Sequence, residues 1–127
     1  MLVSLRHGLL FLSVLTTSCA PVEQDQIYGV YRSNIDHGTE TLEIHKDGTY
    51  LHLYRLDGAV QLKNEGTWRF YRSQEDRRIE FLKYEFVPSR KFGTSKYVTD
   101  LPAEIMQCFF SLCISVLPGS GYLFRKD

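Results

Sequence analysis

Two Asp-Gly dipeptides, ten residues apart, constrain the fold of this chain more than any other feature. Asp47-Gly48 and Asp57-Gly58 each separate runs in which apolar and polar residues alternate. Such a pair between alternating runs is the strongest short-range hairpin signal, because its residues accept the positive φ of a tight turn. The sequence therefore predicts antiparallel strands over residues 39–46, 49–56 and 59–64.

The chain after residue 26 continues in the same way. Asn64-Glu65-Gly66 and Pro118-Gly119-Ser120-Gly121 are further turn signals. Short strands joined by frequent turns are typical of antiparallel barrels and sandwiches, and neighbours in sequence usually pair in space. We expect an all-β, antiparallel up-and-down meander that forms a small barrel. The remaining predicted strands are 27–32, 66–72, 78–87, 108–116 and 121–126.

Residues 87–107 are the least regular part of the chain, with Pro88, Gly93 and Pro102 among many polar residues. The sequence predicts a crossover connection here, with a lid over the barrel mouth as the alternative. Asp100 is expected to cap a short turn directly after it. A strand missing at this place would leave the barrel partly open.

The register of the Asp-Gly hairpins decides which side chains face inward. Two-residue loops segregate apolar from polar side chains most cleanly, so the pattern favours them. A bulge at each turn would shift the pairing by one residue and turn Tyr50, His52 and Tyr54 inward. The first arrangement gathers Leu42, Ile44, Leu51, Leu53, Val60 and Leu62 on one face, and the second puts the two tyrosines and the histidine beside Leu42, Ile44, Val60 and Leu62. The sequence leaves both open.

The N-terminus predicts export. Arg6 and His7 precede an apolar run over residues 9–15, which is far shorter than a membrane span. Leu15-Thr16-Thr17-Ser18-Cys19 then resembles the lipobox of bacterial lipoproteins. The resemblance implies a signal peptide over residues 1–18, a lipid anchor on Cys19, and a tether over residues 19–26 before a domain at 27–127.

The residue after the cysteine sets the predicted location. Lipoproteins kept in the inner membrane often carry aspartate at this position, whereas this chain has Ala20. The resemblance therefore implies the outer membrane, with the domain facing the periplasm. The acyl chains are the expected contact with the membrane, at about 0.8 kcal/mol for each buried CH₂ group.

A second resemblance covers residues 27–86. Gly29-Val30-Tyr31, then Asp47-Gly48-Thr49-Tyr50, then Gly66-Thr67-Trp68, is similar to the repeated phrase of small lipocalin-like bacterial envelope lipoproteins. It implies a lipocalin-like barrel and favours the bulged register, because the aromatic after Asp-Gly-Thr points inward in such barrels. No catalytic residue is carried over by this resemblance.

Charge and motifs exclude several functions. The net charge is zero, so we expect no nucleic-acid partner. No nucleophile, phosphate-loop or paired-carboxylate motif is present, and we expect neither an enzyme nor a cofactor. Glu43, His45 and His52 would share one face only in the two-residue register, and we expect a solvated polar face there instead of a metal site.

Cysteines and aromatic residues supply the remaining candidates. Cys108 and Cys113 form an even pair for a disulfide once Cys19 is lipidated, but in one straight strand they would lie too far apart. A bridge therefore needs a turn or bulge between them. In the bulged register the ligand-lining candidates are Tyr50, His52, Tyr54 and Trp68, and Trp68 is expected to be buried.

The predicted function rests on these features. We expect a non-catalytic binding module for a small apolar ligand or an envelope protein. The alternative is a periplasmic inhibitor or immunity-type protein that blocks an enzyme or toxin. A large interior pocket would favour the ligand, whereas a packed interior with exposed aromatic residues would favour a protein partner.

Overall fold

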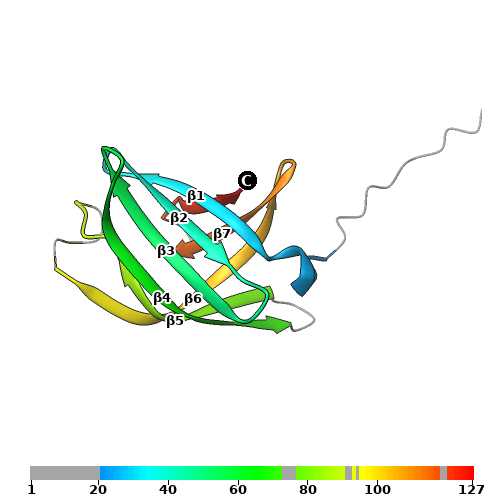
Figure 1. Ribbon diagram of the computed structural model, residues 1–127. Coiled ribbons are helices and arrows are strands. Elements are labelled where there is room, and N and C mark those ends of the chain that lie inside the picture. The colour runs from blue at the N-terminus through cyan, green and yellow to red at the C-terminus, as the bar shows by residue number, and fades with distance from the viewer. Residues whose placement is uncertain (1–20, 73–76, 91–92, 94, 118–119) are drawn as a thin grey trace, which may run out of the picture.

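Eight antiparallel strands succeed one another around a closed barrel, and the last strand pairs with the first (Figure 1). The computed structural model describes residues 21–72, 77–90, 93, 95–117 and 120–127. The all-β meander is confirmed, and it is consistent with a lipocalin-like barrel. Within the described ranges, no helix is long and apolar enough to cross a membrane. The elements are η1, a short 3-10 turn (Gln24–Gln26), then β1 (Gly29–Ile35), β2 (Gly38–Ile44), β3 (Thr49–Leu56), β4 (Ala59–Arg72), β5 (Arg77–Phe86), β6 (Tyr97–Cys108), β7 (Ser111–Leu117) and β8 (Tyr122–Lys126).

The up-and-down topology gives the barrel two ends. We call proximal the end where the described chain begins, which also carries the β2–β3 turn, the β6–β7 turn and the last residue of β8. The distal end carries the β1–β2, β3–β4 and β5–β6 connections. In Figure 1 the start of the described chain (blue) and the β6–β7 turn (orange) both lie at the right-hand end of the barrel.

The bulged register holds in the first hairpin. Ile44 lies opposite Tyr50 and Leu42 opposite His52, one residue away from the pairing of a two-residue loop. The Asp-Gly turn contains one additional residue, and Gly48 takes a φ of 89°. The arrangement favoured by the binary pattern is therefore wrong. The interior accepts the tyrosine and the histidine because their polar atoms find partners there.

In the second hairpin the strand pairing is also shifted by one residue, but the turn itself does not cause the shift. Asp57-Gly58 is a two-residue loop, with Leu56 opposite Ala59, but a bulge near Tyr54 shifts the pairing beyond it. Tyr54 then lies opposite Leu62, and both are buried. Val60, which was expected inside with them, is 51% exposed.

The predicted turn at Asn64-Glu65-Gly66 is wrong, because β4 runs through it without interruption. Gly66 serves a close approach instead of a turn. A Cβ atom at this position would clash with the Leu82 carbonyl oxygen and would lie 2.7 Å from the Tyr50 ring. Strands β3, β4 and β5 thus meet where only a glycine fits.

The region 87–107 holds a strand that the sequence pattern did not predict. Leu101, Ala103 and Ile105 of β6 alternate inward, as a strand requires. Pro102 is tolerated because β6 pairs only with β5 at this point, and its pairing with β7 begins at Glu104. Neither the crossover nor the capped turn at Asp100 is present. The predicted strand over 108–116 is also wrong at its start, because the β6–β7 turn occupies residues 109–110.

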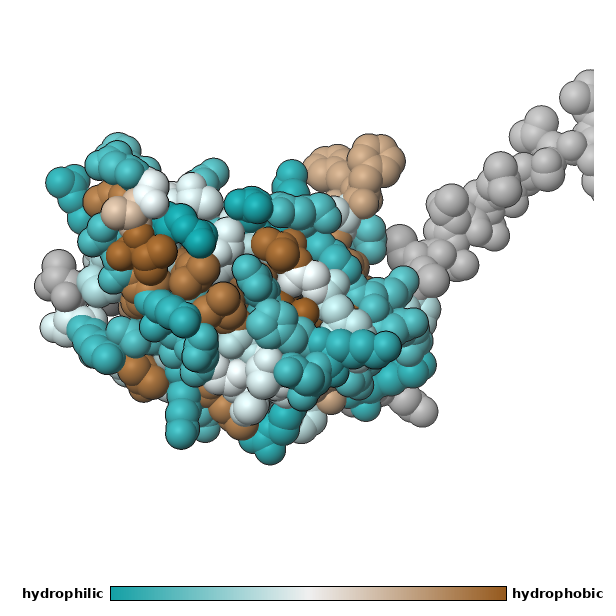
Figure 2. All heavy atoms as spheres, in the orientation of Figure 1, coloured by the Kyte–Doolittle hydropathy of each residue, from teal (hydrophilic) through white to brown (hydrophobic). Residues whose placement is uncertain are grey.

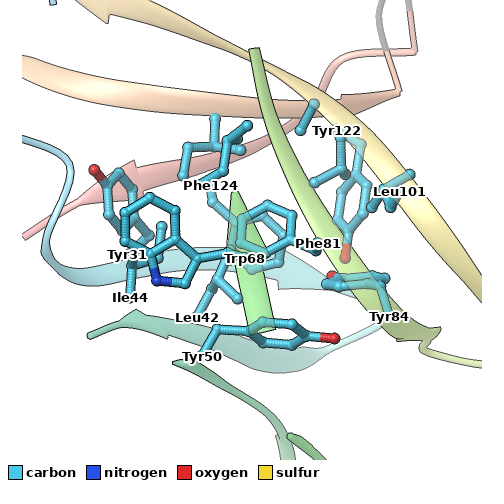
Figure 3. Close-up of a cluster of buried hydrophobic side chains, with 14 of the residues drawn as sticks. Tyr31, Leu42, Ile44, Tyr50, Trp68, Phe81, Tyr84, Leu101, Tyr122 and Phe124 are labelled. Atoms are coloured by element: carbon cyan, nitrogen blue, oxygen red, sulfur yellow. The ribbon is translucent and has the colours of Figure 1, made fainter. Parts of the chain in front are cut away.

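Side chains fill the barrel, and its two halves differ. The proximal half is mainly apolar and includes Ile44, Trp68, Phe81 and Phe124, which belong to the cluster of buried side chains in Figure 3. Trp68 is buried, as predicted, and its Nε1 donates to the His45 carbonyl over 2.9 Å, which closes this end beneath the β2–β3 turn. The distal half contains a group of buried polar side chains.

Candidate functional site

Four polar side chains from four strands meet inside the distal half of the barrel. His52 Nε2 lies 2.8 Å from Glu40 Oε1, and the Tyr122 hydroxyl donates to the other oxygen of the same carboxyl group. The Tyr84 hydroxyl lies 3.4 Å from His52 Nε2, and the two rings stack with centroids 4.7 Å apart. We call these residues the buried polar cluster. All four are at most 4% exposed.

Burial fixes the protonation of the two tyrosines. It raises the pKa of Tyr84 and of Tyr122 well above the usual 10, and the nearby Glu40 carboxyl group acts in the same direction. Both hydroxyls therefore keep their protons and remain hydrogen-bond donors at physiological pH. Figure 3 shows the two hydroxyls turned toward one another.

One atom of the cluster is not satisfied. His52 Nδ1 is buried and has no hydrogen-bond partner among the described residues. A buried polar atom without a partner costs about 1–3 kcal/mol. The cluster is enclosed in the distal half of the barrel, away from solvent.

The wall of the barrel opens directly beside this half. β4 and β5 are paired from Trp68–Phe81 to Arg72–Arg77, at the proximal end only. Toward the distal end they separate and leave an open groove of about 630 Å³. We call it the distal groove. It is lined by Asp36, Tyr54, Leu56, Gln61, Leu62, Lys63, Glu85, Pro88 and Lys96.

Asn64 bridges the two strands where they begin to separate. Its Nδ2 donates to the Lys83 carbonyl over 3.0 Å, and its Oδ1 accepts the Glu85 amide over 3.0 Å. The Tyr50 hydroxyl donates to the Leu82 carbonyl over 2.9 Å at the same place. These contacts replace the missing ladder and fix the inner limit of the groove.

The distal groove combines apolar and charged side chains. Leu62 and Tyr54 are buried in its wall, whereas Lys63 and Lys96 are exposed. Lys96 lies 3.6 Å from Glu85, and the Arg90 amide donates to Asp36 over 3.1 Å. Val60, Tyr97 and Val98 are exposed near the distal ends of β4 and β6. Such a mixture of apolar contact area and charge suits a protein surface.

The proximal end displays the most exposed apolar residues of the described chain. Phe109 and Phe110 form the two-residue β6–β7 turn and are 89% and 102% exposed. Phe109 has a φ of 46°, a left-handed conformation usual for glycine at this turn position. A disulfide joins Cys108 to Cys113 behind the turn, with the Cα atoms 5.8 Å apart. The turn within the pair supplies the proximity that one straight strand does not allow.

The candidate ligand-lining residues occupy separate places. Tyr50, His52 and Trp68 belong to the packed interior, and each makes a hydrogen bond with a neighbouring strand or turn. Only Tyr54 borders the distal groove. Glu40, Tyr84 and Tyr122 of the buried polar cluster were missed. Alternation with Leu42 and Ile44 places Glu40 on the inward face and could have singled it out, but its partners lie on strands far along the chain.

The residues weighed as metal ligands do not come together. His45 lies 3.3 Å from Glu43, and both are partly exposed. His52 points into the barrel, on the opposite face. Among the described residues, no group of three or more His, Cys, Asp or Glu side chains is arranged to hold a metal ion. Residues 1–20, including Cys19 and the predicted signal, lie outside the described residues.

Comparison with known proteins leaves the family open. No family model matches the chain, and no curated protein or solved structure matches it significantly. The resemblance to lipocalin-like lipoproteins therefore stays a prediction beyond the level of the fold.

Proposed function

We propose that this protein is a lipid-anchored, non-catalytic module of the bacterial envelope, and that its distal groove binds a protein partner. The opening between β4 and β5 carries this proposal. It joins apolar area and charge at the end of the barrel opposite the start of the described chain. A protein anchored through Cys19 would turn this end away from the membrane, toward the periplasm.

The packed interior supports a protein partner over a small apolar ligand. Tyr31, Tyr50, Phe81, Tyr84 and Phe124 fill the barrel and are each at most 1% exposed. A ligand inside would have to displace aromatic side chains that close-pack with one another, and a core deletion of this size costs about 3–5 kcal/mol. The open groove needs no such displacement.

The buried polar cluster supports a non-catalytic role. It combines a carboxyl group, an imidazole and two phenols, which are groups that enzymes use for acid–base work. A general base must lie within hydrogen-bond reach of its substrate, and these groups are enclosed. An inhibitory role, the alternative, would use the same docking with an enzyme or toxin as the partner.

The groove is tested by photo-crosslinking in intact cells. A photoreactive amino acid at Gln61, which is exposed in the groove, should give one discrete crosslinked protein. The matched control carries the same group at Thr67, which is exposed on the same strand near its proximal end. Reversing the charge of the rim with Lys63→Glu and Lys96→Glu should abolish the Gln61 product. Equal products from Gln61 and Thr67, or a Gln61 product that survives both reversals, would refute the groove.

The anchor is tested separately. Mass spectrometry of the N-terminal peptide should show acyl chains on Cys19, and Cys19→Ala should move the protein out of the membrane fraction. A wild-type chain without acyl mass, together with a variant that still fractionates with membranes, would overturn the lipoprotein assignment. Neither result affects the crosslinking test.

A further inference from the structure

We propose that the β6–β7 turn inserts Phe109 and Phe110 into the surface of a phospholipid bilayer, so that it forms a second membrane contact beside the N-terminal lipid. We call this turn the Phe-Phe tip. The inference rests on the anchor part of the proposed function for its orientation. The proposed ligand of the proximal end is the lipid interface, whereas the distal groove is proposed to bind a protein.

The exposure of the tip is the first observation. Both aromatic side chains project from the barrel, and neither contributes to the core. Figure 2 shows a hydrophobic knob at the place of this turn in Figure 1, apart from the other brown surface of that view. Scattered exposed apolar residues are ordinary, but two adjacent and fully exposed phenylalanines at the point of a hairpin form a projecting apolar surface.

The backbone of the turn does not call for phenylalanine. A two-residue turn with positive φ at its first position favours glycine there, and this chain places a bulky aromatic side chain at that position. Local structure therefore does not explain Phe109, and packing explains neither residue. A binding role accounts for both.

The tip is also held rigidly. Cys108 pairs with Ser111 across the turn, and the disulfide to Cys113 ties the two strands together directly behind it. A rigid apolar point loses little conformational freedom when it enters another medium, and so more of the transfer free energy remains for binding. The barrel presents the two rings in advance.

The position of the tip identifies the occupant. The described chain begins at Pro21, at the same end of the barrel as the tip (Figure 1). Val22 is already buried against the barrel, and Cys19 lies three residues before it. Three residues span at most about 11 Å. Acyl chains on Cys19 would therefore hold the proximal end, with its tip, close to the bilayer.

A basic side chain beside the tip is compatible with phospholipid headgroups. Arg125 of β8 lies opposite Cys113 and is exposed, with no ion-pair partner among the described residues. Aromatic rings at the level of the headgroups, with a cation nearby, form the usual interfacial combination.

The test uses the single native tryptophan as its background. Trp68 is buried, and so vesicles of phosphatidylethanolamine and phosphatidylglycerol with brominated acyl chains should not quench wild-type fluorescence. In the Phe110→Trp variant the introduced indole should be quenched strongly. The matched control is Val60→Trp, where the new indole is half-exposed at the distal end and should not be quenched.

A second variant measures how much the tip contributes. The double substitution Phe109→Ser and Phe110→Ser is compared with the wild type, both without acyl groups. It should raise the lipid concentration needed for half-maximal vesicle binding, on the order of tenfold for each ring removed. Because neither ring packs in the core, the urea midpoint of this variant should equal that of the wild type. An unchanged midpoint with unchanged lipid binding refutes the proposal.

The outcomes separate the tip from the rest of the proposed function. Quenching at position 110 that does not exceed quenching at position 60 overturns the lipid contact, even when Cys19 is acylated. If the protein proves to lack acyl groups and quenching occurs at position 110 but not at position 60, the lipid contact of the tip is supported and the Cys19 anchor is refuted. Crosslinking at Gln61 is unaffected by either result.

Discussion

The proximal and distal ends of this barrel are closed to different degrees. At the proximal end β4 pairs with β5, β1 pairs with β8, and Trp68 seals the interior beneath a turn. At the distal end the same strand pairs separate. β1 and β8 share only two residue pairs, and a second groove of about 490 Å³ lies along that seam.

The comparison shows how one meander combines stability with open surface. The β4–β5 and β1–β8 ladders are confined to the proximal end, and the distal end keeps these strands in place through side chains such as Asn64 and Glu40. Regions with fewer ladder hydrogen bonds open more readily. We therefore expect the two ends to respond differently to the same kind of change.

The largest expected effect is at the proximal seal. Trp68→Ala should lower the free energy of unfolding by about 3–5 kcal/mol, because it removes a large core side chain and leaves a cavity. Tyr54→Ala at the distal groove should cost clearly less, since its ring borders open space and its hydroxyl contacts are 3.4–3.5 Å long. Urea unfolding measures both. Equal losses would mean that the ends are equally packed.

Alkaline pH should act through the buried tyrosines of both halves, because burial raises the pKa of Tyr31 and Tyr50 nearer the proximal end as well. The pKa values of Tyr84 and Tyr122 are raised in the folded state, so their contribution to stability is complete below pH 10 and is lost as the pH rises above it. Two such groups lower the free energy of unfolding by about 3 kcal/mol between pH 9 and pH 11. Tyrosinate absorbance, measured together with circular dichroism, should show these phenols ionising only as the barrel unfolds. Ionisation of every tyrosine while the barrel stays folded would contradict their burial.

Removing one hydroxyl compares the two halves directly. Tyr122→Phe leaves an oxygen of the buried Glu40 carboxyl group without its donor, and should cost about 1–3 kcal/mol. The control, Tyr31→Phe at the proximal end, loses a 2.7 Å hydrogen bond to the Ile27 carbonyl and should cost about 1 kcal/mol. If the proximal substitution costs more, the polar cluster does not hold the distal half together.

The smallest expected effect on stability is a difference between substitutions at the two Asp-Gly turns. The Asp47 carboxylate accepts the Thr49 amide and hydroxyl, and these hydrogen bonds hold its pKa below the ordinary value. Its contribution is present at neutral pH and disappears as the pH falls through that lowered pKa. Asp47→Asn should therefore slightly reduce stability at pH 7 and have no effect near pH 2. Asp57→Asn at the distal turn is the matched control, and a pH-dependent loss of the same size there would remove the distinction.

Local sequence signals predicted the turns correctly where the backbone conformation depends only on the turn residues themselves. Asp47-Gly48 and Asp57-Gly58 identified two hairpins, because a tight turn depends on the φ of its own residues. Gly66 misled the same reasoning, since its role is to let the Tyr50 ring and the Leu82 carbonyl approach from strands that the local sequence does not reveal. β6 was missed because Pro102 is expected to interrupt a strand. A proline does so only where a neighbouring strand needs its backbone amide as a hydrogen-bond donor, and β7 does not pair with β6 at this point.

The buried polar cluster was harder to predict than the strands, because its residues are far apart in the sequence. His52 was singled out from the sequence, but its partner Glu40 lies twelve residues away and Tyr122 seventy further on from His52. Neither spacing is a motif. The Phe-Phe tip became visible only when a turn was found inside what the pattern predicted as one strand.

The sequence by itself determined the all-β meander, its two Asp-Gly hairpins and the burial of Trp68, because turn chemistry and alternation act over a few neighbouring residues. Only the tertiary structure decided the register, the separation of β4 from β5 and the partners of Glu40. Register shifts by one residue reverse every side chain of a strand, and the free energy that selects between them comes from partners far along the chain. For this barrel, those partners turned a histidine inward against the simpler pattern and satisfied a glutamate that shares the inward face with Leu42 and Ile44.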